Sequence, residues 1–464
     1  MHGTIRGGAL VIRFVGALAA LALTGACGSV RLGTRDTPTP APVQPAPARA
    51  AGPNVDPVDF LRRHGRIAHG APFPFSGSVG YLASARDDST DMMVALSFAT
   101  ASLRFRSDGD QYRADYRVTL TVRRGEASVA RVEAAQPLRV ATLRETHRSD
   151  ESVLFQQLVA RAPGSYALTI ALRDDASGIT VSEDVALQVP ALRDGTLSTP
   201  IACYQAAPRA SRDSLPAFVV NPQAVATMGR DSAITICAEH YGPPSGVLQA
   251  AAQVEGQVVW RDSVALAATA GVSSATLNVP VSRLGPGVGS VQLWTGASDT
   301  VRTPVFVSIG DELPVTSYED MVGYLRYFVS AERLRQLLSV PPAGRGTAWT
   351  AFLHETDTIP STPENEALDE YLARVRRANE RYGDARTPGW KTDRGMVLLL
   401  LGDPDQVLEQ GTNDVSQRAR SQMWEYTALG LTVEFVFSPQ LNEWRLTPAS
   451  DAQVRAYARR RIGT

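Results

Sequence analysis

The sequence predicts a multidomain fold in which two immunoglobulin-like antiparallel β-sandwich modules precede an α+β C-terminal domain. Over residues 73–190 and 197–310, short runs of alternating apolar and polar residues are separated by Gly, Asp and Ser, as in antiparallel β-structure. From residue 311 onward, apolar residues recur at helical spacing and strand-like runs follow, which predicts an α+β domain over residues 311–464. The length of 464 residues agrees with about three domains.

The amino-acid composition and charge indicate which kinds of binding partner to expect. Hydrophobic residues make up 44% of the chain and charged residues 20%, which is an ordinary globular balance. The 46 basic residues are matched by 47 acidic ones, so no basic excess is available to neutralise a phosphate backbone. We therefore expect no nucleic-acid partner.

Residues 1–26 have the pattern of a secretory signal, because a basic start is followed by an apolar stretch, residues 14–23, too short to span a bilayer. The run Leu23-Thr24-Gly25-Ala26-Cys27 resembles the lipobox of bacterial lipoproteins, which implies cleavage before Cys27 and a membrane-anchoring lipid on its thiol. An ordinary secretory cut at the same bond, leaving a spare thiol, is the alternative. The next residue, Gly28, implies sorting to the outer membrane, facing either the periplasm or the cell surface.

Residues 27–55 form a predicted tether. The run from Thr37 to Pro47 is rich in proline and alanine and has no apolar periodicity. Such a segment is expected to be an extended, polyproline-like spacer that holds the folded part away from the membrane.

The strands of the two sandwich modules are predicted from β-rich runs. In the first module these are residues 93–98, 116–122 and 166–172, and in the second they are residues 217–220, 233–237, 257–260 and 291–294. The turn Pro163-Gly164-Ser165-Tyr166 resembles the turn that enters a strand in immunoglobulin-like envelope modules. A glycine-rich loop at residues 285–289 lacks the helix and the closing Lys-Ser/Thr pair of a phosphate-binding loop, so no nucleotide is expected.

Cys203 and Cys237 both belong to the second module. In an oxidising compartment two cysteines in one β-domain favour a disulfide, although two separate buried thiols are the alternative.

In the C-terminal region we expect a helix with Thr362 as its N-cap and Gly383 as its end. After it, apolar and alternating runs predict strands, and a basic segment predicts a closing helix. The predicted strands are residues 396–401, 422–427, 431–437 and 443–446, and the predicted helix is 451–461.

One motif in this region resembles a known family. Gly389-Trp390-Lys391-Thr392-Asp393 spells the motif of the GWxTD-domain family, and Arg394-Gly395 follows it directly. Further family-like segments occur in family order over residues 311–448: Leu401-Gly402-Asp403-Pro404-Asp405, Trp424-Glu425-Tyr426 and Phe435-Val436-Phe437. The resemblance implies a secreted or lipid-anchored bacterial protein. It brings no assigned reaction and no established catalytic residues.

The candidate binding or motif residues follow from this series. They are Gly389, Trp390, Thr392, Asp393, Arg394, Asp403, Asp405, Trp424 and Tyr426. A helix-borne His-Glu-x-x-His pair and a Gly-x-Ser-x-Gly elbow are both missing from the sequence, so we predict no catalytic residues, metal or cofactor.

Two functions remain open. The first is a binding or assembly module whose C-terminal domain recognises an envelope protein or polymer. The second is a hydrolase of an envelope polysaccharide or peptide, in which carboxylates act as acid and base and tryptophans stack a sugar. The residues for it would be Asp393, Asp403, Asp405, Glu425, Glu434, Trp390 and Trp424. Each also has a structural explanation as a turn or core residue.

For the motif itself we predict a mainly structural role, with a ligand-facing site as the alternative. Gly389 would adopt a backbone angle that a side chain opposes, and Trp390 would fill the space between helix and sheet. Thr392 and Asp393 would accept hydrogen bonds from amides of the turn, and Lys391 would point to solvent.

Overall fold

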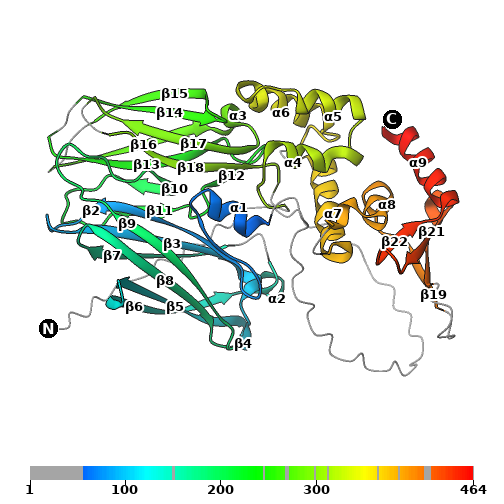
Figure 1. Ribbon diagram of the computed structural model, residues 1–464, viewed down its shortest axis with the longest axis horizontal. Helices are drawn as coiled ribbons and strands as arrows, with labels where there is room; N and C mark the ends of the chain where they lie inside the picture. The colour runs from blue at the N-terminus through cyan, green and yellow to red at the C-terminus, as the bar shows by residue number, and fades with distance from the viewer. Residues whose placement is uncertain are drawn as a thin grey trace.

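The computed structural model in Figure 1 describes most of the chain after the tether. The described residues are 56–148, 152–243, 246–266, 271–296, 299–310, 313–362, 365–384, 387–411 and 420–462. The predicted signal, Cys27 and the tether lie outside these ranges. No helix within them is long and apolar enough to cross a membrane.

Two antiparallel sheets form the first part of the fold, next to the short helix α1 (Pro57–Arg63). One sheet has the order β1 (Ile67–His69), β2 (Phe75–Ala83), β3 (Thr90–Ala99), β7 (Ser152–Arg161). The other has the order β4 (Arg106–Asp108), β5 (Gln111–Arg124), β8 (Gly164–Asp174), β9 (Thr180–Val189), and β6 (Ala127–Val140) also pairs with β5. Every second residue of β5 from Ala114 to Val122 is buried in the cluster between these sheets, so the predicted alternation is observed.

Two further sheets are built from residues 201–308. One has the order β11 (Ala217–Val220), β10 (Ile201–Ala207), β13 (Ala233–Tyr241), β16 (Val272–Pro280). The other has the order β12 (Val225–Thr227), β18 (Val301–Ser308), β17 (Gly287–Trp294), β14 (Val247–Val254), β15 (Gln257–Ala265), with β12 parallel to β18. All seven strand runs predicted for residues 93–294 lie within observed strands.

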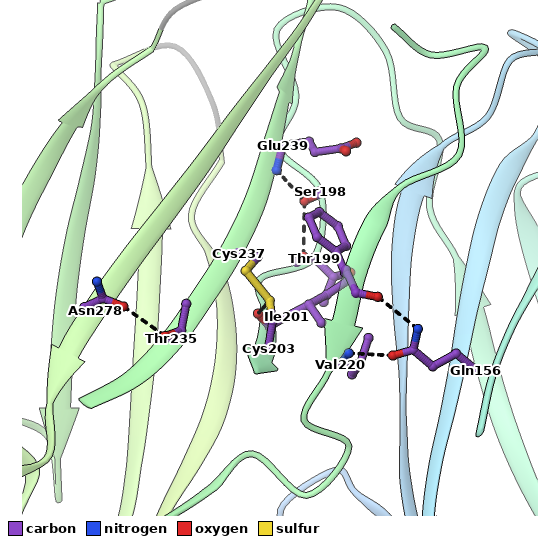
Figure 2. The surroundings of a disulfide bond; sticks show 11 residues. Gln156, Ser198, Thr199, Ile201, Cys203, Val220, Thr235, Cys237, Glu239 and Asn278 are labelled. Carbon is purple, nitrogen blue, oxygen red and sulfur yellow. Dashed lines mark hydrogen bonds between the residues drawn. A yellow bond between two sulfur atoms is a disulfide. The ribbon is translucent and has the colours of Figure 1, made fainter. Parts of the chain in front are cut away.

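The four sheets lie in layers, because the two inner sheets are buried on both faces (Figure 1). In β3, Met92 and Val94 face the core of the first pair of sheets, while Met93 packs in a different cluster with Ile201 of β10. The side-chain amide of Gln156 in β7 also bridges to β11, donating to the carbonyl oxygen of Phe218 at 2.9 Å (Figure 2). The two pairs of sheets are therefore packed face to face.

A disulfide lies in this central interface (Figure 2). Cys203 and Cys237 stand on the adjacent strands β10 and β13 with their Cα atoms 6.4 Å apart, and the disulfide prediction is confirmed. Both side chains are buried among residues from both pairs of sheets. The bond therefore joins two strands of the layer that contacts the first pair of sheets.

Removing this disulfide is expected to destabilise the protein. Replacing both Cys203 and Cys237 with alanine should lower the free energy of unfolding by about 3–4 kcal/mol, because the unfolded chain loses a closed loop. Chemical denaturation measures the loss. In a Cys27→Ser background the unfolded, unreduced chain should take up no alkylating reagent, and reaction of both remaining thiols would contradict the bridge.

A buried ion pair reinforces the same interface. The Arg209 guanidinium donates to Glu239 Oε2 at 3.2 Å and to the carbonyl oxygen of Ala83, at the end of β2, at 3.0 Å. The Tyr241 hydroxyl donates to Glu239 Oε2 at 2.8 Å and accepts from the Ala83 amide at 2.8 Å. Burial raises the pKa of Glu239, although the charge of Arg209 opposes the shift. Polar groups of both pairs of sheets are thus hydrogen-bonded to one another out of contact with water.

The C-terminal region begins with helices that pack on the second pair of sheets. They are α4 (Tyr318–Gly323), the 3-10 helix η2 (Tyr324–Tyr327), α5 (Ala331–Leu338) and α6 (Pro342–Thr356). A Cβ on Gly346 of α6 would lie 1.8 Å from the carbonyl oxygen of Ser282 in α3 (Val281–Leu284), so the two backbones touch. Arg345 of α6 forms ion pairs with Glu255 and Glu319.

One buried cluster extends from the second pair of sheets into these helices. It contains Val305 and Phe306 of β18 together with Trp349 and Phe352 of α6. Strands of the second pair of sheets and the helices that follow them therefore share one buried cluster.

The chain ends with helices around a four-stranded antiparallel sheet (Figure 1). The helices are α7 (Glu366–Tyr382), the 3-10 helices η3 (Gly389–Lys391) and η4 (Thr427–Leu429), α8 (Asp393–Leu401) and α9 (Pro448–Ile462). The strands, in sheet order, are β19 (Gln406–Gly411), β20 (Arg420–Tyr426), β21 (Leu431–Ser438) and β22 (Glu443–Leu446). Three of the four strands predicted here are confirmed.

Two local predictions are wrong. Residues 396–401 form the last six residues of helix α8 and not a strand, because a short apolar run fits either element and the capping residue Thr392 favours the helix. The N-cap of α7 is Asn365, whose side chain accepts from the amide of Leu368 at 3.0 Å. Thr362 instead donates to the carbonyl oxygen of Ile359 ahead of the helix.

Candidate functional site

The motif glycine lies where α7 and η3 come into backbone contact. A Cβ on Gly389 would lie 1.8 Å from the carbonyl oxygen of Ala378 and 2.7 Å from the amide nitrogen of Gly383. Gly395 fits against Gly389 in the same way, with its Cβ position 1.9 Å from the Gly389 carbonyl oxygen. Gly389 is not among the described residues with positive φ, so the predicted reason for this glycine is wrong. Close approach of two backbones, and not an unusual angle, requires it.

Gly389→Ala is expected to destabilise the domain by about 1–3 kcal/mol, because the added methyl group has no space beside α7. Gly323→Ala is the matched control. Gly323 also lies in the helical region, but nothing lies within 4 Å of its Cβ position and its φ is −57°. That substitution should be neutral or stabilising by up to about 1 kcal/mol. Equal melting temperatures for the two variants would contradict the close-contact explanation.

Trp390 is a core residue of the helical part, with 6% of its surface exposed. Its amide donates to Asn379 Oδ1 of α7 at 3.2 Å, and its ring meets Tyr324 of η2 edge to face at 5.5 Å. The Arg326 guanidinium and the Lys391 ammonium lie 5.6 and 5.2 Å from the ring centroid. Lys391 was predicted to point to solvent. It is instead half-buried against the indole, because a cation is attracted to the face of an aromatic ring.

Thr392 and Asp393 connect the motif to its surroundings. Thr392 caps α8, since its Oγ1 accepts from the amide of Gly395 at 3.0 Å and donates to the Gly389 carbonyl oxygen at 2.7 Å. Asp393 Oδ2 accepts from the amide of Leu446 in β22 at 2.8 Å, and not from the turn as predicted. Its partner is 53 residues away in sequence, so the contact depends on the fold. Asp393 thereby ties the start of α8 to an edge strand.

The two aspartates that follow α8, Asp403 and Asp405, also accept hydrogen bonds from groups of the same domain. Asp403 accepts from Arg381 Nη1 of α7 at 2.6 Å, and Arg377 lies 3.6 Å away. Asp405 Oδ2 accepts from the amide of Thr427 at 2.7 Å. These contacts match the structural explanation of the Gly-Asp-Pro-Asp turn.

Trp424 and Tyr426 lie on the buried face of the sheet. Trp424 is 1% exposed, between Tyr382 and Phe435 at ring distances of 5.7 and 4.8 Å. The Tyr426 hydroxyl donates to the carbonyl oxygen of Gly402 at 3.1 Å, and burial raises its pKa. Neither ring offers a free face to a ligand.

A second group of side chains does reach the surface, and we call it the arginine–aromatic surface. It consists of Tyr382, Arg394, Arg420, Phe437 and Trp444. The Arg394 guanidinium carbon lies 4.7 Å from the Tyr382 ring centroid and 5.2 Å from that of Trp444. The Arg420 guanidinium carbon lies 5.5 Å from Trp444 and 5.9 Å from Phe437. Arg420 is exposed and the other four are half-buried.

Sequence reasoning singled out only Arg394 from this surface. The register of β21 and β22 places Phe437 opposite Trp444. Arg420 is the first residue of β20, which pairs with β21 on its other side. The alternation of these strands was visible in the sequence, but the pairing that brings the residues together was not.

Among the residues that the structure describes, groups suited to acid–base or metal chemistry do not gather at the motif. The carboxyl groups whose pKa burial raises, Asp91 and Glu239, lie in β3 and β13. Within the described ranges no three His, Cys, Asp or Glu side chains are arranged to hold a metal ion. The candidate carboxylates Asp393, Asp403 and Asp405 accept the structural hydrogen bonds given above.

Residues 296–453 match the sequence profile of the GWxTD domain. The chain contains a GWxTD domain. The match begins before residue 311 and includes strand β18, which shares its buried cluster with the helices. No curated protein sequence matches the chain.

Two solved structures are similar to parts of the GWxTD-containing chain. The fibronectin(III)-like modules of Clostridium thermocellum CbhA share 12% identity, cover 47% of this chain and 85% of their own, and have a TM-score of 0.13. DIP-gamma IG1+IG2 shares 14% identity, covers 47% of this chain and 88% of its own, and has a TM-score of 0.12. Because these scores are low, the architecture described above rests on strand pairing alone.

Proposed function

We propose that this protein is a binding or assembly module of the bacterial cell envelope, and that its GWxTD domain recognises an envelope protein or polymer through the arginine–aromatic surface. The observation that carries the proposal is the convergence of Arg394 and Arg420 on Trp444 at an incompletely buried site. Tryptophan, tyrosine and arginine are the residues that contribute most to binding energy in protein interfaces. The motif residues Gly389 to Asp393 would then support this surface without contacting the ligand.

The β-sheets that precede the GWxTD domain are suited to act as a rigid support for it. We propose that the four layered sheets are two immunoglobulin-like β-sandwich modules and that the α+β domain follows them. The disulfide would stiffen the inner sheet of the second module, and the hydrogen bonds of Arg209 and Tyr241 to Ala83 would hold the two modules together. The extended, polyproline-like tether expected over residues 27–55 would hold this base away from the membrane surface.

Trp444→Ala tests the proposed surface. In the native cells, crosslinking of the full-length protein should capture one reproducible partner, and Trp444→Ala should abolish that capture while the melting temperature stays close to that of the parent. Trp260→Ala is the control, because Trp260 is also half-buried but lies on β15, away from the GWxTD domain's sheet. Equal capture by both variants and the parent would reject this surface as the binding site.

Lipid anchoring is proposed for Cys27. Cys27→Ser is expected to abolish fatty-acid labelling and to release the protein from membranes, since the thiol is the acceptor of the lipid. Labelling with radioactive palmitate and membrane fractionation measure both effects. Unchanged labelling and fractionation of the variant would reject the lipobox interpretation.

A further inference from the structure

Strand β6 lies at the edge of an outer sheet of the layered fold (Figure 1). It is 14 residues long, and among the described strands it pairs only with β5. Its inward side chains Ala130, Val132 and Ala134 pack against the core of the first pair of sheets but stay half-buried, and Val129 is 43% exposed. A long strand edge of this kind can pair with a further strand.

The backbone groups at this edge belong to the odd-numbered residues of β6. The carbonyl oxygen of Asp115 in β5 accepts from the amide of Asp175, which follows β8, at 3.0 Å. Because the amide and carbonyl of one residue point to the same side of a strand, Asp115 is turned toward β8, and its partner Pro137 in β6 is turned away from β5. The register is regular over this part of the ladder, so Arg131 and Glu133 also present their N–H and C=O groups at the edge. Pro137 has no N–H and therefore favours pairing through the residues before it.

The sequence of this edge is complementary to itself. Ala130-Arg131-Val132-Glu133-Ala134 reads the same in both directions, except that arginine and glutamate exchange places. If two copies pair antiparallel about a two-fold axis at Val132, each Arg131 lies opposite Glu133 of the other copy. Moving the axis by one residue to either side would place two arginines or two glutamates opposite each other. The charges therefore select one register.

Glu133 can join such a pairing and keep its present hydrogen bond. Its Oε1 accepts from Arg117 Nη1 at 2.6 Å, whereas its Oε2 lies 3.6 Å from the guanidinium of Arg131 in the same strand, beyond hydrogen-bonding distance. The side chains of Arg131 and Glu133 are 66% and 40% exposed. Both are therefore accessible to a second copy of the chain.

We propose that β6 pairs with β6 of a second copy, in antiparallel register about Val132, and that the protein forms a homodimer in this way. The backbone groups of Arg131 and Glu133 exchange hydrogen bonds across the axis, and their side chains form two ion pairs on the exposed face. Val132 of each copy meets its equivalent on the inner face. The pairing is short, so the dimer is weak and depends on concentration. The inference does not depend on the arginine–aromatic surface.

Disulfide crosslinking tests the register. In a Cys27→Ser background, Val132→Cys should form a disulfide-linked dimer on oxidation with diamide, because residue 132 of each copy stands directly opposite the other. Ala130→Cys is the matched control, since Ala130 is also half-buried on the same face. It would lie opposite Ala134, roughly 14 Å from its own equivalent, and should not crosslink.

Exchange of charges tests the ion pairs. Sedimentation velocity of the purified full-length chain should show a monomer–dimer equilibrium, and Arg131→Glu should weaken the dimer about tenfold, because it places like charges opposite each other twice. The double variant Arg131→Glu with Glu133→Arg restores opposite charges and should dimerise as the parent does. A role of these side chains in folding alone would not produce this recovery.

Three results would overturn the homodimer inference: a parent chain that stays monomeric at every concentration, equal crosslinking of Val132→Cys and Ala130→Cys, or a double variant that dimerises no better than Arg131→Glu. If Val132→Cys is linked in the native cells to a different protein instead, the edge receives a foreign strand and the assignment to a second copy fails. Each of these results leaves the arginine–aromatic surface untouched, because Trp444→Ala tests that surface separately.

Discussion

Trp390→Ala is expected to lower the free energy of unfolding by about 3–5 kcal/mol, the usual cost of truncating a large buried aromatic side chain. The indole is 6% exposed and packs against Tyr324 and the Arg326 guanidinium, so its removal leaves a cavity between η2 and the η3–α8 segment. Thermal and chemical denaturation of the full-length chain measure the effect.

The control for this prediction is Trp444→Ala in the same domain. Trp444 is half-buried and belongs to the proposed binding surface, so its loss should reduce partner capture far more than stability. The two substitutions are therefore expected to have different effects: Trp390→Ala lowers stability, and Trp444→Ala lowers partner capture. If Trp390→Ala keeps its melting temperature but no longer captures the partner, the motif tryptophan is a contact residue and the structural role is wrong.

Arg209→Ala should cost about 3–5 kcal/mol, because it leaves the carboxylate of Glu239 buried without its counter-charge. The side chains of this pair are 1% and 0% exposed. The substitution also removes the donor to the Ala83 carbonyl oxygen in the neighbouring pair of sheets. Equilibrium denaturation in urea provides the free energy of unfolding.

Two variants show whether the buried charge causes this loss. Arg86→Ala removes an arginine whose ion pair with Asp88 is exposed, with side-chain exposures of 73% and 76%, and should cost less than about 1 kcal/mol. The double variant Arg209→Met with Glu239→Leu removes both charges and should be more stable than Arg209→Ala alone. A loss for Arg209→Ala no greater than that for Arg86→Ala would disprove the role assigned to the pair.

The wrong prediction of a strand over residues 396–401 has a physical cause. The run Met396-Val397-Leu398-Leu399-Leu400-Leu401 is apolar at every position, so it carries no period that separates a buried strand from a buried helix. Its structure depends on Thr392, which caps the helix, and on Gly402, which ends it with φ +86°. Threonine is suited both to a turn and to an N-cap, so the sequence alone does not identify Thr392 as the start of a helix.

Local patterns determined a large part of this protein. Alternation in stretches such as Ala114 to Val122 predicted the strands, two cysteines in one β-module predicted the disulfide, and Gly389 to Asp393 predicted the domain family. Each of these signals lies within a few residues of chain or in a residue type whose chemistry is narrow.

Only the tertiary structure decided how these parts meet. The face-to-face layers, the bond from Asp393 to Leu446 and the convergence of Arg394 and Arg420 on Trp444 join residues that are distant in sequence. Such contacts depend on strand register and on which face of each sheet is covered. Alternation of apolar and polar residues predicts that a strand has two different faces, but it does not predict which elements pack against each face.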